Sequence, residues 1–131
     1  MGNQEKIILC DTNIILEFFK GNDNVVRQLK AIQSKNIRIS IVTSMEIVYG
    51  SLNKRELEKL IKALGKLTVY QITPTISELA YELMQSYSLS HNLDIPDALI
   101  AATAIEHDIS LFTHNLKHFR YLTGLELYTP D

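Results

Sequence analysis

The feature that most constrains this chain's fold is the alternation of short apolar runs with segments of helical periodicity. The runs of strand length cover residues 7–10, 37–42, 68–72 and 109–113. Between them, apolar residues recur at helical spacing in segments 14–20, 23–35, 43–49, 54–64 and 94–107, and in a long helix starting at Thr73-Pro74. This order predicts an α/β fold: a three-layer domain with a mainly parallel central sheet flanked by helices. Residues 125–128 are a candidate fifth strand at the sheet edge.

Length and composition predict one globular domain spanning residues 1–131. The chain has 131 residues, of which 46% are hydrophobic and 21% charged, enough to bury a core. No apolar run approaches the roughly 18–20 residues of a membrane span, and the run after the polar start at residues 1–6 is too short for a signal peptide. Cys10 is the one cysteine and has no intramolecular partner. We therefore expect a cytoplasmic protein without a membrane partner.

The basic residues are unevenly distributed, although the formal net charge is only −2. Ten of the 13 Lys and Arg lie in residues 20–66, whereas residues 67–116 contain none. Two interpretations stay open. The basic residues form the solvated faces of two helices, or they form a flank that holds a phosphate backbone beside an acidic site.

Three acids occupy comparable places along the predicted elements. Asp11 directly follows the first strand, and Glu46 follows the second strand in the first turn of the next helix. Asp97 lies in the first turn of the apolar helix 94–107. The carboxyl ends of parallel strands share one sheet edge, where ligands bind, so we expect Asp11 and Glu46 near that edge. Asp97 joins them if its helix also starts there.

Each acid taken alone has a structural explanation. Asp11 fits the N-cap of the following helix, and Thr43 with Glu46 has the spacing of a capping box, as do Thr75 and Glu78 in the long helix. Asp94 fits an N-cap, with Asp97 favoured in the first turn by the helix dipole.

The apolar surroundings of Asp11 and Asp97 favour a functional role. Carboxylates gathered in such surroundings repel one another unless a divalent cation neutralises them. Oxygen ligands suit Mg²⁺ or Mn²⁺, which can polarise a phosphoryl oxygen and activate a water for phosphodiester hydrolysis. The sequence contains no Walker loop, no G-x-G-x-x-G motif and no Ser-His-Asp arrangement.

Four segments, in order, resemble the motifs of the PIN-domain family, and in particular its VapC-like toxins. Residues 9–15, LCDTNII, resemble the opening D-T-N/S motif, and residues 41–50, IVTSMEIVYG, resemble the second motif with its Glu and final Y-G. Residues 96–104, PDALIAATA, are similar to the third motif, and residues 111–119, LFTHNLKHF, to the fourth. Together they cover nearly the whole chain.

The resemblance implies that Asp11, Glu46 and Asp97 are catalytic, metal-binding acids. It also implies four polar supports around metal, water or phosphate, with helix capping an equal alternative for the two asparagines: Thr12, Asn13, Thr113 and Asn115. His118 stands where many relatives have a fourth acid, and histidine is a poor Mg²⁺ ligand. We therefore expect one well-bound metal, with any second site completed by substrate phosphate.

The function implied by the resemblance is a Mg²⁺- or Mn²⁺-dependent endoribonuclease that cleaves RNA by metal-activated water. The implied setting is a VapBC-type toxin–antitoxin pair: a homodimer, inhibited by a small antitoxin protein, that contacts DNA only indirectly through the antitoxin. Two alternatives stay open, a housekeeping RNA-processing nuclease and a catalytically weak or inactive module that binds RNA or protein. A phosphatase is disfavoured because position 13 is Asn, whereas a phosphatase would have D-x-D.

Overall fold

The computed structural model describes residues 6–130 and arranges their four strands in one parallel sheet of order β3-β2-β1-β4. The strands are β1 (Ile8–Cys10), β2 (Ile37–Ser40), β3 (Thr68–Tyr70) and β4 (Ser110–Phe112). The predicted α/β class with a parallel central sheet is confirmed. The predicted polar start lies largely outside the described residues, as does the last residue of the predicted domain.

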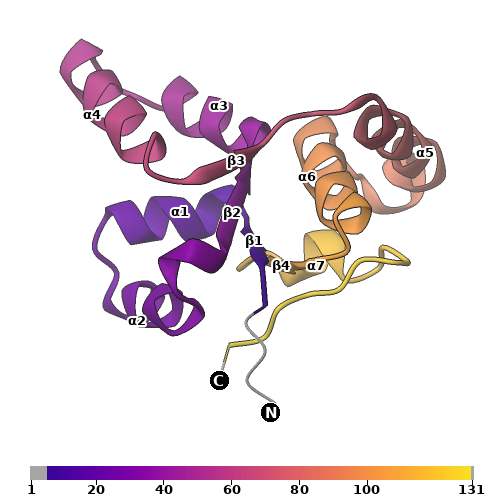
Figure 1. Ribbon diagram of the computed structural model, residues 1–131. Helices are drawn as coiled ribbons and strands as arrows, with labels where there is room; N and C mark the ends of the chain where they lie inside the picture. The colour runs from indigo at the N-terminus through magenta and orange to yellow at the C-terminus, as the bar shows by residue number, and fades with distance from the viewer. Residues whose placement is uncertain (1–5, 131) are drawn as a thin grey trace.

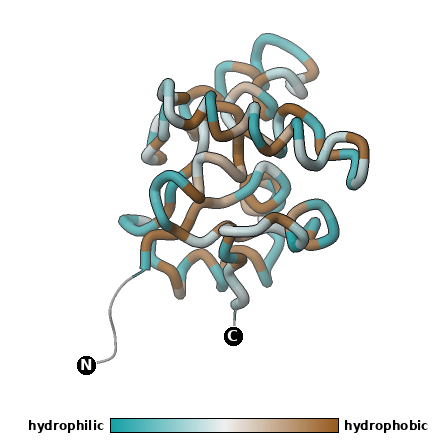
Figure 2. Tube along the Cα trace, turned by 90° about the vertical axis from the view of Figure 1, so that its right-hand side faces the viewer, coloured by the Kyte–Doolittle hydropathy of each residue, from teal (hydrophilic) through white to brown (hydrophobic). Residues whose placement is uncertain are grey.

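Helices cover both faces of the sheet (Figure 1). They are α1 (Thr12–Phe19), α2 (Asp23–Ile32), α3 (Ile41–Tyr49), α4 (Lys54–Leu64), α5 (Pro74–His91), α6 (Ile95–Glu106) and the short α7 (Leu116–Phe119). Helices α1 to α4 lie on one side and α5 and α6 on the other, and α3 with α4 forms an arm that projects from the sheet (Figure 1). Hydrophobic and hydrophilic residues alternate along the helices, as amphipathic packing requires (Figure 2).

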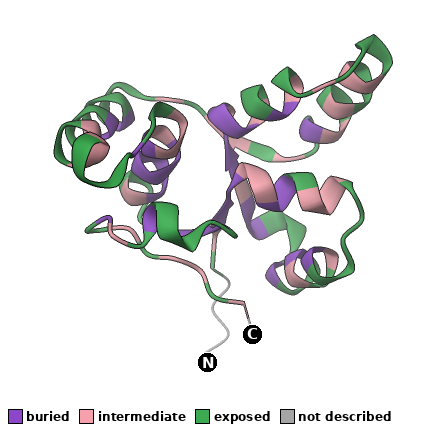
Figure 3. Ribbon diagram, turned by 180° about the vertical axis from the view of Figure 1, so that it is seen from behind, coloured by how far each residue is buried: buried purple, intermediate pink, exposed green. Residues whose placement is uncertain are grey.

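Two hydrophobic cores form because successive strand residues point to opposite faces. In β1, Ile8 and Cys10 pack into the core shared with α1 and α2, whereas Leu9 packs into the core beneath α5 and α6. In β4, Leu111 and Phe112 divide between the cores in the same way. Buried residues accordingly line the central strands and the inward turns of the helices, while most of α4 stays outside the core (Figure 3).

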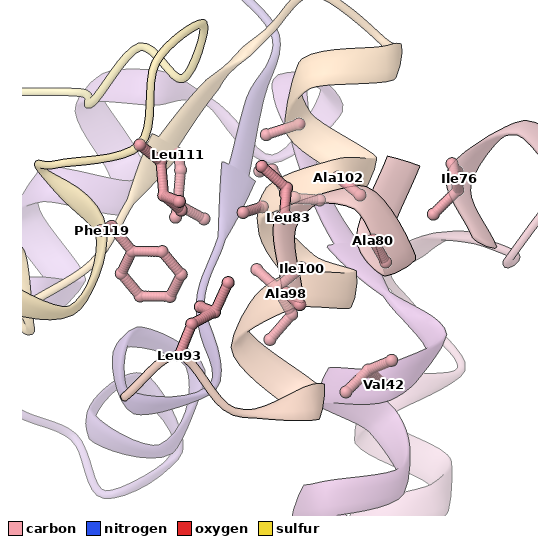
Figure 4. Packing of buried hydrophobic residues seen from close by; sticks show 14 residues of the cluster. Val42, Ile76, Ala80, Leu83, Leu93, Ala98, Ile100, Ala102, Leu111 and Phe119 are labelled. Atoms are coloured by element: carbon pink, nitrogen blue, oxygen red, sulfur yellow. The ribbon is translucent and has the colours of Figure 1, made fainter. Parts of the chain in front are cut away.

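The core beneath α5 and α6 explains why the sequence of α6 is apolar nearly all round. Ala98, Ile100, Ala101, Ala102 and Ala104 are all buried there (Figure 4). Helix α5 packs along α6, which the small alanine side chains permit. The first turn of α6 is thereby fixed beside the sheet.

The second strand and the helix after it differ from the prediction. β2 ends at Ser40, whose hydroxyl oxygen accepts a hydrogen bond from the Val42 amide at 3.0 Å, and this cap starts α3 at Ile41. Residues 41 and 42 are β-branched, which favours a strand in the sequence pattern although both lie in the helix. The predicted capping box of Thr43 and Glu46 is wrong, since Thr43 lies inside the helix and Glu46 beyond its first turn.

Two further local predictions are wrong. The long helix α5 is capped by Thr73, which accepts a hydrogen bond from the Ile76 amide at 3.2 Å, so Thr75 is not the capping residue. Residues 125–128 do not form a fifth strand. Only a single parallel bridge joins Leu127 to Leu111, because the segment runs beside β4 for too short a distance.

Within the described part of the chain, no helix is long and apolar enough to cross a membrane. Cys10 is a free, fully buried thiol in β1.

Candidate functional site at the carboxyl edge of the sheet

Asp11 lies directly after β1 and is held by hydrogen bonds from two sides. It is the N-cap of α1, where its Oδ1 accepts from the Thr12 amide at 2.8 Å. Its Oδ2 accepts a hydrogen bond from the hydroxyl of Thr113 at 2.8 Å, and Thr113 directly follows β4. The residue is only 4% exposed. Asp11 therefore both caps α1 and lies in the candidate site.

Glu46 is exposed on α3 and is oriented by Thr12. The Thr12 Oγ1 lies 2.6 Å from Glu46 Oε1 and 3.0 Å from Thr43 Oγ1. Thr12 has one hydroxyl proton and an ionised carboxylate can only accept, so Thr12 donates to Glu46. Thr43 is fully buried and holds Thr12 from the other side. The sequence does not reveal this contribution, because the spacing of Thr43 to Glu46 resembles a capping box.

Asp97 lies in the first turn of α6, as predicted, and Asp94 caps that helix by accepting from the Asp97 amide at 3.0 Å. The Asp97 carboxylate is 22% exposed, and its Oδ2 lies 3.4 Å from Nδ1 of His118 on α7. The residue at the position of the usual fourth acid is thus in direct contact with the third acid.

The pKa values of Asp97 and Asp11 are raised by burial and by neighbouring acids. Burial and then the negative charges of Asp94, Asp11 and Glu46 raise the pKa of Asp97 to about 6, against the lowering effect of His118. Burial also raises the pKa of Asp11, while the hydrogen bonds from Thr113 and Thr12 lower it. The structure therefore brings Asp11, Glu46 and Asp97 into one electrostatic cluster.

The supporting residues have different roles. Thr113 is buried and bridges two groups, since it donates to Asp11 and accepts from the Asn115 amide at 3.0 Å. Asn13 is inside α1, and its Oδ1 accepts from the His114 amide at 3.4 Å, which ties α1 to the loop after β4. Asn115 stands at the N-cap of α7, but its side chain makes no capping hydrogen bond. For Asn13, capping is the wrong explanation, because Asp11 is the N-cap of α1 and Asn13 lies inside that helix.

The donor set fits an oxygen-preferring divalent cation in its chemistry, although it is not a closed set of ligands. Among residues 6–130, no three His, Cys, Asp or Glu side chains are grouped tightly enough to hold a metal ion as they stand. Burial, and then the charges of neighbouring acids, raise the pKa values of Asp11 and Asp97 despite the lowering effect of His118 and, for Asp11, of two hydrogen bonds. A cation between them would relieve that repulsion.

A groove beside Glu46 was not predicted from the sequence. It lies between α1, α3 and α4, with a volume of about 800 Å³. Its lining combines apolar residues, among them Phe19 and Leu60, with three basic residues and two acids: Lys20, Arg55, Lys59, Glu46 and Glu56. One sequence signal points to this surface. Apolar residues recur at helical spacing along α4, yet only Leu64 of that helix is buried, and Leu60 lines the groove.

Known proteins share both the sequence pattern and the fold. The PIN domain family model matches residues 8–124. The chain is 30% identical over 118 residues to ribonuclease VapC10 of Mycobacterium tuberculosis, covering 86% of each protein. It is 30% identical over 135 residues to ribonuclease VapC1 of Methanocaldococcus jannaschii, covering 98% of this chain and 91% of that protein.

Solved toxin–antitoxin structures are similar over nearly the whole chain. A toxin–antitoxin complex from Klebsiella pneumoniae superposes with a TM-score of 0.78 at 32% identity, covering 95% of this chain and 98% of the other. VapBC2 from Rickettsia felis, bound to a DNA fragment from its promoter, gives a TM-score of 0.79 at 27% identity over the same shares. The matched segment includes Asp11, Glu46 and Asp97, and the chain therefore belongs to the PIN-domain family, among its VapC-like members.

Proposed function

We propose that this protein is a Mg²⁺- or Mn²⁺-dependent endoribonuclease and the toxin of a VapBC-type toxin–antitoxin pair. The observation that carries the proposal is the convergence of Asp11, Glu46 and Asp97, from three separate elements, at one edge of the sheet. The names of the relatives, which are ribonucleases, support the same reaction class.

Asp11, Glu46 and Asp97 are the residues that would hold the metal. A bound Mg²⁺ or Mn²⁺ supplies Lewis-acid polarisation of a phosphoryl oxygen and lowers the pKa of water. Asp11 would be the most rigid ligand, because two hydrogen bonds and burial fix its carboxylate. Glu46 would be the most adaptable, because it is exposed and held only through the Thr12 hydroxyl.

The surrounding residues position these acids. Thr113 supplies a hydrogen bond that lowers the pKa of the buried Asp11 carboxyl against the raising effect of burial, since donors favour the charged form. Thr12 of α1 sets the direction of Glu46 on α3, and Thr43, on the same helix as Glu46, holds the Thr12 hydroxyl. The Asn115 side chain is exposed and makes no capping hydrogen bond, and in this proposal it would contact a substrate phosphate or water.

The proposed partners are an RNA substrate, a small antitoxin and a second copy of this chain, in the cytoplasm; DNA would be contacted only through the antitoxin. The groove beside Glu46 is suited to the antitoxin. Its apolar lining would take the hydrophobic face of a helical segment, and Lys20, Arg55 and Lys59 would pair with acidic residues on that segment. A partner in this groove would cover Glu46 and block the site.

A catalytically inactive RNA- or protein-binding module is the second candidate. One observation favours it: His118 contacts Asp97 at the position where many relatives have an acid. A housekeeping processing nuclease differs from a toxin in genomic setting, because a toxin gene should lie beside a short antitoxin reading frame.

The test is RNA cleavage with Mg²⁺ or Mn²⁺, with and without a chelator. We expect cleavage by the wild type that the chelator and Asp11→Ala both abolish. Asp23→Ala is the matched control, because it removes an exposed acid at the start of α2. Equal cleavage by wild type and Asp11→Ala would point to a contaminating nuclease and remove the proposal. A wild type without cleavage under any metal would favour the binding module.

A further inference from the structure

Three aromatic rings form a stack between the end of α5 and the segment after α7. The rings of His91 and Tyr121 are stacked, with centroids 4.0 Å apart and planes at 15°. Tyr87 meets His91 edge-on at 5.6 Å and lies 5.2 Å from Tyr121. Each ring contacts the other two, so the three rings form one aromatic unit.

Two rings of the stack pack against the core, and the third is exposed to solvent. Tyr87 and Tyr121 are partly buried and pack against the core beneath α5 and α6. His91 is exposed, although it is the last residue of α5, and its Nδ1 lies 2.8 Å from the Ser90 hydroxyl oxygen. Core packing explains the two tyrosines. It does not explain an exposed ring that is held flat against Tyr121 and oriented by a hydrogen bond.

This unit lies beside the acid cluster. His91 precedes Asp94 by three residues and Tyr121 follows His118 by three residues, so neither backbone separation exceeds about 11 Å. The pKa of the Tyr121 hydroxyl is raised by burial and then by the negative charges of Asp97 and Asp94, which places that hydroxyl within electrostatic range of both acids. An RNA strand that extends from the acid cluster toward the end of α5 would reach the stack.

The charge of the surface around the three rings indicates which part of a nucleic acid that surface would bind. Residues 67–116, which include α5 and α6, contain no Lys or Arg, so the α5 side of the stack has no cation of its own, whereas the exposed Lys117 and Arg120 lie on the Tyr121 side. Bases present flat faces that stack on aromatic side chains without needing a cation. The exposed imidazole of His91, stacked on Tyr121, is therefore a candidate surface for a base.

We propose that His91, backed by Tyr121 and Tyr87, stacks on an unpaired base of the RNA strand next to the phosphodiester at the acid cluster. The proposal rests on the ribonuclease function proposed above and adds a contact that distinguishes single-stranded or looped RNA from duplex. It makes His91 a positioning and specificity residue with no part in the reaction at phosphorus.

The chain has no tryptophan, so a reporter can be introduced without background. His91→Trp keeps an aromatic face on Tyr121 and gives a fluorescent ring at the proposed contact. With a chelator present to prevent cleavage, this variant is titrated with a single-stranded oligoribonucleotide and with an oligomer of the same length that lacks bases. Tyr81→Trp, at a residue 70% exposed on the same helix, is the control.

We expect the base-containing oligomer to quench the tryptophan at position 91 at concentrations at least fivefold lower than the abasic oligomer does, and to leave the tryptophan at position 81 unaffected. Equal quenching by both oligomers, or none at position 91, would overturn the proposal. Either result is independent of cleavage, which is measured separately. Cleavage without base-dependent quenching would leave the ribonuclease function standing and remove the base contact.

Unlabelled variants separate stacking from hydrogen bonding. His91→Phe keeps the ring, whereas His91→Asn keeps a polar group near Ser90 and removes the ring. We expect Asn to weaken binding of the base-containing oligomer by roughly 5- to 100-fold, and Phe to bind like the wild type. The abasic oligomer should bind both variants equally. Equal weakening for both oligomers in the Asn variant would mean a general structural defect and contradict the stacking role.

Discussion

Thr12 Oγ1 lies 2.6 Å from Glu46 Oε1, so the first residue of α1 holds a carboxylate that belongs to α3. Thr12 directly follows Asp11, which means that one short segment orients two of the three acids. The arrangement couples the geometry of Glu46 to the N-cap of α1. It also predicts that the Thr12 hydroxyl contributes to activity through Glu46 and to stability through the buried Thr43.

Thr12→Val should lower RNA cleavage by roughly tenfold or more, because Glu46 loses the donor that directs it and small misplacements of catalytic groups are expensive. The free energy of unfolding should fall by about 1–3 kcal/mol, because the buried Thr43 hydroxyl loses its partner, whereas the exposed Glu46 takes water in place of the threonine hydroxyl. Kinetics and denaturant unfolding measure the two effects. Thr12→Ser keeps the hydroxyl and should retain most activity; a serine variant as slow as the valine variant would contradict this.

Asp97→Asn should stabilise the metal-free protein by about 1–3 kcal/mol near pH 7. The pKa of Asp97 is about 6 in the folded state, above the roughly 3.9 of an unfolded Asp. The folded state therefore binds the proton more tightly, so wild-type stability falls as pH rises from about 4 to about 6, and the full penalty remains at pH 7. Thermal unfolding in chelator at pH 4 and pH 7 checks this.

The same variant should lose stabilisation by metal. Mg²⁺ or Mn²⁺ should raise the melting temperature of the wild type and leave that of Asp97→Asn nearly unchanged, because a ligand stabilises only the state that binds it. A variant less stable than wild type in chelator at pH 7 would show that Asp97 has a structural role that outweighs its electrostatic penalty.

The sequence was sufficient to predict the parallel sheet and the position of Asp11 at its edge. Strands buried on both faces appear as short, continuous apolar runs, and the polar residue after such a run marks the end of the strand. Sequence periodicity failed at residues 41 and 42, where β-branched side chains suggested a strand and the Ser40 cap starts a helix. It also could not bring Asp97 to the other acids, since that depends on how α6 packs beside the sheet. The role of Thr43 and the groove at α4 arise only from tertiary packing.

Calorimetric titration with Mn²⁺ should show one strong site, which Asp97→Asn removes. His118 occupies the position of a fourth acid, 3.4 Å from Asp97, and an imidazole is a weaker partner for Mg²⁺ or Mn²⁺ than a carboxylate. His118→Asp should therefore add affinity or a second site. Two equal tight sites in the wild type would contradict this account of His118.

Reversing two charges on α4 tests whether the basic half of the chain contacts RNA. Lys59 and Lys62 are exposed, and Lys59 also lines the groove beside Glu46. If they hold phosphate, the double change Lys59→Glu and Lys62→Glu should weaken RNA binding roughly tenfold or more at low salt. It should also reduce the slope of log affinity against log salt by about 0.7 for each phosphate that the variant no longer neutralises.

The control for that double variant is Arg27→Glu with Lys30→Glu on α2, two exposed residues outside the groove. Both double variants change the net charge by the same amount, two charges at each of two residues, so long-range repulsion of RNA acts on both. A local contact would weaken binding only in the α4 variant. Equal weakening in the two variants would mean that Lys59 and Lys62 act only through net charge and belong to a solvated face.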